Sequence, residues 1–201
     1  MTSFREKAIL EAAKSVFMEK GYSGARMQKI ADKANINKSM LHYYFRSKEQ
    51  LFGDIIEDMT LNIVAKYSCI IDSEITVIEK FDKIIDEYTD LMVQNPYAPL
   101  FLLNEISQNN SKHINTMKAA ISNSRSSNKF LKQILKEQKL GLIKSTPSNQ
   151  VIFTVLSLLV FPFIANSFVK NILEIEDESY TQIILERKAL IKTVLRQFLM
   201  T

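Results

Sequence analysis

The stretch GYSGARMQKIADKANINKSMLHYYFRSKEQL, residues 21–51, decides the fold of this chain. It contains two short segments in which apolar residues recur with helical spacing, joined by Asn35-Ile36-Asn37. Asn35 tolerates the left-handed backbone conformation that a tight turn requires. The side chain of Asn37 is suited to cap the second segment. The stretch therefore predicts two short helices separated by a tight turn.

The two predicted helices divide their residues between an inner and an outer face. Lysine and arginine lie on the outer face, and the inner face carries Ile30, Ala31, Ile36 and Leu41. A packed scaffold that presents a short second helix fits the DNA major groove, where exposed residues of that helix meet base edges. The pattern predicts a helix-turn-helix.

Helical spacing continues on both sides of this stretch. Ser3 and Glu6 form a capping-box pattern that opens a helix, and Gly21 is expected to end that helix. Ser47 and Gln50 repeat the capping-box pattern before a further helix. The predicted helix-turn-helix is thus framed by a helix on each side.

The charge of the chain is concentrated in this region. The formal net charge is +4, yet residues 1–50 carry ten basic and five acidic residues. The remaining residues carry 16 basic and 17 acidic residues. Such a basic module on a neutral body is typical of nucleic-acid binding, although a solvated basic face would account for the charge alone equally well.

Several classes of protein do not fit this composition. One cysteine and two histidines cannot form a zinc cage or a disulfide framework, and no G-x-G phosphate loop is present. Acidic residues are scattered, and neither histidine lies near a candidate nucleophile. We expect no enzyme, no catalytic residue, no metal and no cofactor. Cys69 suits a reducing cytosol and the N-terminus lacks an apolar core, so we expect a cytoplasmic protein without a secretion signal.

The rest of the chain also has helical spacing, with two open questions. A helix over Ile78–Met92 is expected to end before Pro96, and the last helix spans Ile184–Phe198. Lys112–Leu140 fits either one helix or two, and we favour a break near Ser124 and Asn128, where polar residues interrupt the apolar face.

The segment Val151–Val169 is apolar over 19 residues, which is long enough for a membrane span. Pro162 and Asn166 lie within it, and its flanks lack a basic cluster. A helix that is apolar all round is also expected between a domain and a partner subunit. We favour burial at a subunit interface over a membrane span.

The central stretch resembles the tetracycline-repressor (TetR) family of bacterial regulators. The resemblance covers about residues 4–55 without gaps and rests on Gly21-Tyr22, Ile30-Ala31, Ala34, Leu41, Tyr43-x-Phe45 and Ser47-Lys48-Glu49-x-Leu51. It implies an all-α fold of about nine helices. A helix-turn-helix DNA-binding domain would span residues 1–47, and a larger helical ligand-binding and dimerisation domain would span residues 48–201. Two positions depart from the family, since Ala25-Arg26 replaces a hydroxyl pair and Asn35 replaces glycine.

The resemblance also implies roles for particular residues. The helix Lys38–Tyr44 would enter the major groove, with four residues facing bases: Lys38, Ser39, Met40 and His42. Contacts to phosphates would come from Arg26, Gln28, Tyr43, Tyr44 and Lys48. The residues themselves leave open an ordinary surface position for His42 and a packing role for one of the two tyrosines.

The function implied is that of a homodimeric repressor that binds a palindromic operator in double-stranded DNA, with no membrane partner. The dimer would form through the last two helices, at about residues 150–170 and 181–199. A small apolar or aromatic effector would release the DNA from a pocket, for which the candidate residues are Tyr88, Met92, Phe101, Asn104, Met117, Ser124, Asn128 and Phe153. The alternative is a regulator that is independent of ligands or responds to another protein.

Overall fold

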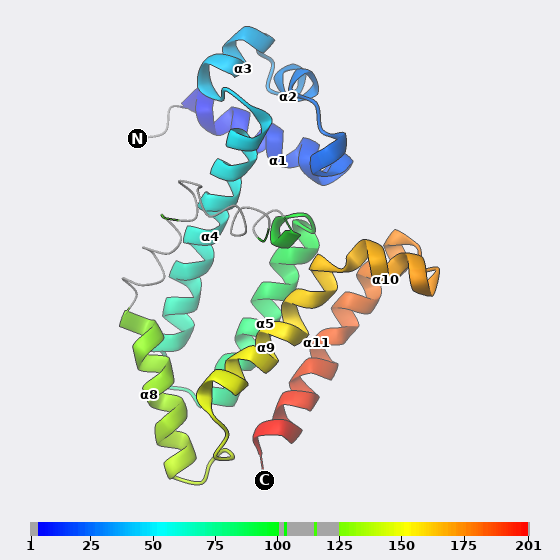
Figure 1. The fold of residues 1–201 in the computed structure, drawn as a ribbon. Coiled ribbons are helices and arrows are strands. Elements are labelled where there is room, and N and C mark those ends of the chain that lie inside the picture. Colours follow the sequence, from blue (N-terminus) through cyan, green and yellow to red (C-terminus); the bar gives the residue numbers. More distant parts are fainter. Residues whose placement is uncertain (1–3, 101–102, 104–114, 116–124, 201) are drawn as a thin grey trace. The chain divides into compact units, whose positions relative to one another are not determined.

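The computed structural model describes residues 4–100, 103, 115 and 125–200 (Figure 1). These residues contain nine helices and no strand: α1 (Phe4–Gly24), α2 (Met27–Lys33), α3 (Lys38–Tyr44), α4 (Lys48–Asp72), α5 (Val77–Gln94), α8 (Arg125–Lys139), α9 (Ser148–Ile164), α10 (Asn166–Leu173) and α11 (Asp177–Leu199). The all-α prediction is confirmed. The helices form two compact units, and the boundary lies inside α4, between Asn62 and Ile63.

The first unit is built on α1, α2, α3 and the first half of α4. The inner face predicted for the helix-turn-helix is confirmed for Ile30, Ala31 and Leu41, whose side chains are fully buried. Ile36 is half-buried. These residues share one core with apolar side chains from the two flanking helices, among them Ile9, Val16, Phe17, Leu51, Phe52 and Ile55.

The turn between α2 and α3 follows the sequence signals. Asn35 has a φ of 54°, which is the left-handed conformation predicted for it. The Oδ1 atom of Asn37 accepts a hydrogen bond from the backbone amide of Met40 at 2.7 Å. Because an unpaired amide at a helix start is satisfied in this way, the cap defines where α3 begins.

The two capping-box predictions have different outcomes. The Ser47 hydroxyl accepts a hydrogen bond from the Gln50 amide at 3.1 Å, as expected, but the Gln50 side chain accepts from the Arg46 amide at 3.2 Å instead of completing the box. Ser3 lies outside the described residues. A complete box is found at the start of α5, where Thr76 and Glu79 cap each other. The same serine or threonine to glutamate spacing would have revealed it.

Gly21 interrupts α1 with a φ of 67° and a ψ of 171°. This combination of angles is essentially restricted to glycine, because a Cβ atom would clash with the backbone. The predicted stop of the first helix is therefore found at Gly21, and a short helical turn follows it up to Gly24.

Replacing Gly21 with alanine should lower the free energy of unfolding of the first unit by about 2 kcal/mol, because the residue must keep a strained backbone conformation. Gly24→Ala is the matched control. Its added Cβ atom would approach the Lys20 Cβ atom at 3.4 Å, and no positive φ is required there. We expect the control to change the same free energy by less than about 0.5 kcal/mol. Urea unfolding of the two variants compares them, and equal losses would contradict this explanation.

The second unit has its own core, to which four helices contribute. Its buried side chains are Val77, Phe81 and Ile85 of α5, Phe130 and Ile134 of α8, Val151, Val155 and Leu159 of α9, and Ile191, Leu195 and Leu199 of α11. Three ion pairs join α5 to α11 beside this core: Asp82 with Arg196, Asp86 with Lys192, and Asp90 with Lys188. Both series repeat every four residues, so they fix the two helices in one antiparallel register.

A buried polar network links the start of α5 to α8. The Glu137 carboxylate accepts hydrogen bonds from the Val77 amide at 3.0 Å and from Gln133 Nε2 at 2.7 Å. Lys80, with 1% of its surface exposed, donates to the Ile71 carbonyl and to Gln133 Oε1, each at 2.5 Å. Burial lowers the pKa of Lys80. Each of these polar groups has a partner, as buried polar groups require.

The apolar segment expected as one helix over Val151–Val169 is divided in the structure, which corrects that prediction. It forms α9 and α10, which meet at Ala165 at an angle of 69°. Pro162 cannot donate a helical hydrogen bond, and its carbonyl accepts from the Tyr180 hydroxyl of α11 at 2.8 Å. Among the described residues no single helix meets the length and hydropathy expected of a membrane span, and only the bent pair of α9 and α10 does so together.

Candidate nucleic-acid interface

The outer face of α3 carries most of the residues that the sequence assigned to DNA bases. Lys38, Ser39 and His42 are exposed, and Met40 is half-buried. Leu41, on the opposite side of the helix, is fully buried and anchors α3 to the first unit. A seven-residue helix held in this way presents one polar face to solvent, which is what insertion into a major groove requires.

The two tyrosines at the end of α3 have different surroundings. Tyr43 is 83% exposed, whereas Tyr44 is half-buried. Their rings meet edge to face with centroids 5.5 Å apart. Of the two, Tyr44 is the one with a packing role, and the Tyr43 hydroxyl is free to reach outward. The imidazole of His42 lies 3.3 Å from the Arg46 carbonyl, between Nδ1 and oxygen.

The first turn of α2 presents Arg26 and Gln28, and both are exposed. Gln28 Nε2 donates to Asp32 Oδ1 at 2.8 Å, which fixes its side chain along the helix. Two other cations of α2 are used within the unit, since Lys29 pairs with Glu19 at 2.9 Å and Lys33 donates to Ser15. Lys29 and Lys20 hold the pKa of Glu19 at about 2. Arg26 and Lys38 have no such partner among the described residues, so their charges are available for an anion.

Lys48, which the resemblance assigned to a phosphate, is half-buried. Its Nζ atom donates to the carbonyls of Tyr22 and Ala25, at 3.0 and 3.3 Å, and lies 4.6 Å from the centre of the Tyr22 ring. The Tyr22 hydroxyl donates to Glu49 Oε1 at 3.0 Å. Hydrogen bonds from its own backbone amide and from Tyr22 lower the pKa of Glu49. Sequence reasoning did not identify these contacts of Tyr22 and Glu49.

The residues proposed for an effector pocket are only partly brought together. Tyr88 is half-buried on α5 with its ring edge-on to Phe163, at 6.0 Å between centroids, and Met92 is buried on the same helix. Asn128 is exposed, and Phe153 is 65% exposed, so both lie on the surface of the chain. Phe101, Asn104, Met117 and Ser124 lie outside the described residues.

Tyr67 of α4 is a candidate pocket residue that sequence reasoning missed. Its hydroxyl is buried and has no hydrogen-bond partner. Burial, followed by the nearby Tyr88, raises the pKa of Tyr67 above its usual range. Burial likewise raises the pKa of Tyr88. Only the exposure of the hydroxyl could have shown this, because a tyrosine on an apolar helix face is an ordinary core residue in sequence.

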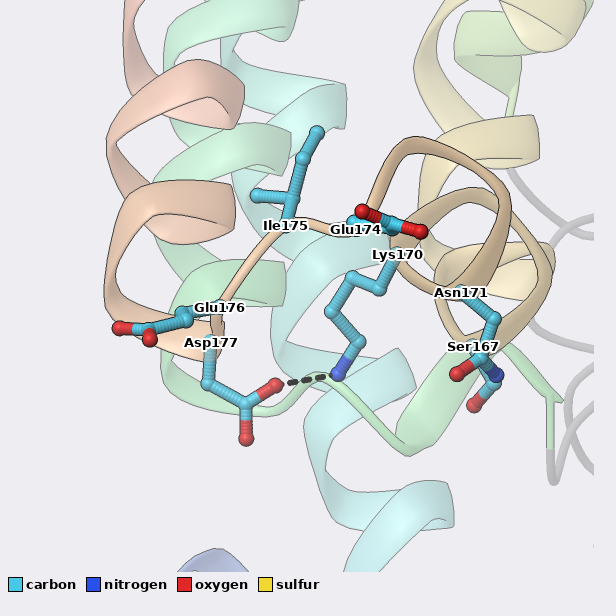
Figure 2. A pocket seen from close by; sticks show the side chains of 7 residues that line it. All are labelled: Ser167, Lys170, Asn171, Glu174, Ile175, Glu176 and Asp177. Atoms are coloured by element: carbon cyan, nitrogen blue, oxygen red, sulfur yellow. Dashed lines mark hydrogen bonds and ion pairs between the residues drawn. The ribbon is translucent and has the colours of Figure 1, made fainter.

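A second depression lies where α10 meets α11, with a volume of about 570 Å³ (Figure 2). Lys170 and Asp177 form an ion pair of 2.5 Å across it, and the Lys170 ammonium also lies 6.0 Å from the centre of the Tyr180 ring. The main charges of this depression therefore satisfy each other. Within the described ranges, no group of three metal-ligating side chains comes together.

Comparison with known proteins links the first unit to regulators. Residues 9–55 match the family described as bacterial regulatory proteins, tetR family. The chain is 45% identical over 49 residues to the HTH-type transcriptional repressor NicS of Pseudomonas putida. It is 46% identical over 57 residues to the HTH-type transcriptional regulator RutR of Escherichia coli K12. These matches span about a quarter of each chain, 24% and 23% for NicS and 28% and 27% for RutR.

Solved structures resemble the chain over most of its length. A regulator of the TetR/AcrR family from Thermobifida fusca has a TM-score of 0.67 at 18% identity, covering 94% of this chain and 97% of the other. The regulator FadR from Bacillus subtilis, solved with stearoyl-CoA, has a TM-score of 0.60 at 16% identity, covering 92% and 96%. At these identities the likeness shows a common fold. The fold of a helix-turn-helix unit followed by a larger helical unit is thus shared with known regulators.

Proposed function

The N-terminal domain of this chain belongs to the tetR family of bacterial regulatory proteins, and from this premise we propose that the chain is a transcriptional repressor. In this proposal residues 1–47 bind a palindromic operator, and residues 48–201 hold the dimer interface and an effector. The observation that carries the proposal is the outer face of α3. It combines exposed Lys38, Ser39, His42 and Tyr43 on a helix whose other side is buried.

The composition of this face suits both parts of DNA recognition. Lysine, serine and histidine side chains donate hydrogen bonds to base edges, and Met40 offers an apolar contact to a thymine methyl group. Arg26 and Tyr43 are exposed at the ends of the same surface and suit phosphate contacts. Phosphate contacts make affinity depend on salt.

A homodimer is supported by the two apolar faces of α9. One face carries buried Val151, Val155 and Leu159. The opposite face carries Phe153, Leu156 and Phe161, which are 65%, 50% and 58% exposed. On α11, Ile183 and Leu190 are also exposed. Apolar side chains exposed together mark an interaction surface, and a second copy of the chain would cover it.

An effector that is apolar or aromatic, with a hydrogen-bond acceptor, is supported by Tyr67, Tyr88 and Met92. The unpaired Tyr67 hydroxyl is a donor in apolar surroundings, where a ligand oxygen would satisfy it. The structure of FadR with stearoyl-CoA gives one case in which this fold holds a ligand with a long apolar chain. The effector would act by favouring a conformation whose two DNA-binding domains no longer match the operator half-sites.

Selection of bound DNA from a random duplex pool at moderate salt tests the proposal. We expect the full chain to recover a palindrome whose half-sites are about one helical turn apart or a multiple of it. Recovery of no motif, with weak binding that disappears as salt rises, would contradict sequence-specific binding.

The assignment of bases to α3 gives a second test. Lys38→Ala and Met40→Ala should each change which bases are preferred at one or two operator positions, with a loss of about 1–3 kcal/mol for the preferred base. Arg26→Ala should weaken binding to all sequences alike. Repeating the selection with each variant compares them, and indistinguishable base preferences would contradict the roles.

A further inference from the structure

We propose that Lys48 is a positioning residue, which fastens the first turn of α4 to the turn before α2 and thereby orients α2 and α3. The family resemblance implies a phosphate contact for the same residue. The inference rests on the proposed function for its DNA-binding test, and a second test is independent of DNA.

The ammonium group of Lys48 is already occupied within the first unit. Two hydrogen bonds reach the carbonyls of Tyr22 and Ala25, and the Tyr22 ring covers the charge. These carbonyls lie at the end of α1, where the aligned peptide dipoles favour a cation. A lysine whose charge is satisfied in this way has less to offer a phosphate than Arg26, which is exposed and has no described partner.

Tyr22 is held firmly enough to transmit this contact. Its ring lies 5.0 Å from the Phe52 ring and 6.0 Å from the Phe17 ring, measured between centroids. Its hydroxyl donates to Glu49, the residue after Lys48. Consecutive residues of α4 therefore hold the backbone and the side chain of the same tyrosine.

The contact with Ala25 places the beginning of α2. Ala25 is 2% exposed and directly precedes Arg26, the N-cap residue of α2, whose own side chain makes no capping hydrogen bond. The position of α2 thus depends on what holds Ala25. Since only three residues separate α2 from α3, a change at Ala25 moves the DNA-reading helix as well.

The salt dependence of operator binding distinguishes positioning from phosphate contact. Measured on the selected duplex, at a temperature where all variants are folded, Lys48→Ala should weaken binding about tenfold. The slope of log affinity against log salt should stay at the wild-type value. Arg26→Ala, which removes a proposed phosphate contact, should reduce that slope by about 0.9. Lys48→Arg should restore affinity, because a guanidinium also donates to both carbonyls.

A fall of the slope by about 0.9 in Lys48→Ala would identify a phosphate contact and overturn the inference. So would unchanged affinity in that variant, which would reduce the Tyr22 and Ala25 contacts to a purely structural role.

Hydrogen exchange in the free chain provides the test without DNA. In Lys48→Ala, the amides of Ala34 and Leu41 should exchange about tenfold faster, whereas amides of α5 and α11 should be unchanged. Wild-type exchange at both positions would overturn the inference. If the wild-type chain binds no duplex, the proposed function fails, and this measurement alone decides the role of Lys48.

Discussion

Leu156→Glu should convert the proposed dimer into a monomer and weaken operator binding by about a hundredfold or more. Leu156 lies on the outward apolar face of α9 and is 50% exposed in the single chain. In a symmetric dimer each copy would bury this glutamate against the same apolar face of its partner, which leaves an unpaired charge. A monomer engages one half-site of a palindrome and loses the gain from binding both together, which is typically about 10²–10⁴.

Leu135→Glu is the matched control for this experiment. Leu135 is also 50% exposed but lies on α8, away from the proposed interface. Light scattering coupled to size-exclusion chromatography gives the mass of each variant, and titration with the operator gives its affinity. A dimer that survives Leu156→Glu while retaining full affinity would contradict the interface on α9.

Glu137→Ala should lower the free energy of unfolding of the second unit by about 3 kcal/mol. The carboxylate is 6% exposed and accepts from the Val77 amide and from Gln133. Its removal leaves the Val77 amide without that acceptor, and it removes the nearest negative charge in a network that contains buried Lys80. Unsatisfied buried groups carry their full desolvation penalty.

Two variants control for the removal of side-chain atoms and charge. Glu137→Gln retains an acceptor oxygen, so we expect a smaller loss than with alanine. Lys136→Ala changes the exposed neighbour on the same helix and should alter the free energy of unfolding by less than about 0.5 kcal/mol. Urea unfolding of the three variants measures the order. Equal stability of Glu137→Ala and Lys136→Ala would contradict a structural role for the buried carboxylate.

The helix-turn-helix could be predicted from the sequence because its signals are local. Asn35 and Asn37 act on their own backbone and on that of the next few residues, and the spacing of Ile30, Ala31 and Leu41 reflects one turn of helix. Gly21 is similar, since its backbone angles exclude other residues. For the same reason the exposed face of α3 followed from knowing its buried face.

The division of the apolar segment into α9 and α10 could not be predicted in this way. Pro162 marked a possible break, but the carbonyl that it leaves is satisfied by Tyr180, which lies 18 positions later in the chain. The exposure of Phe153, proposed for a pocket, likewise depends on which side of α9 meets the core. A helix that is apolar on both faces gives no indication of its orientation.

Local backbone chemistry and apolar periodicity therefore determined the α-helical class, the turn between α2 and α3 and the surface that α3 presents. Contacts between distant residues decided the rest: the occupation of Lys48 by Tyr22 and Ala25, the buried network of Glu137 and the unpaired hydroxyl of Tyr67. The physical reason is that a hydrogen bond or an ion pair depends on separation in space. A residue type and its sequence neighbours specify only the part of that environment which lies within a few turns of the same helix.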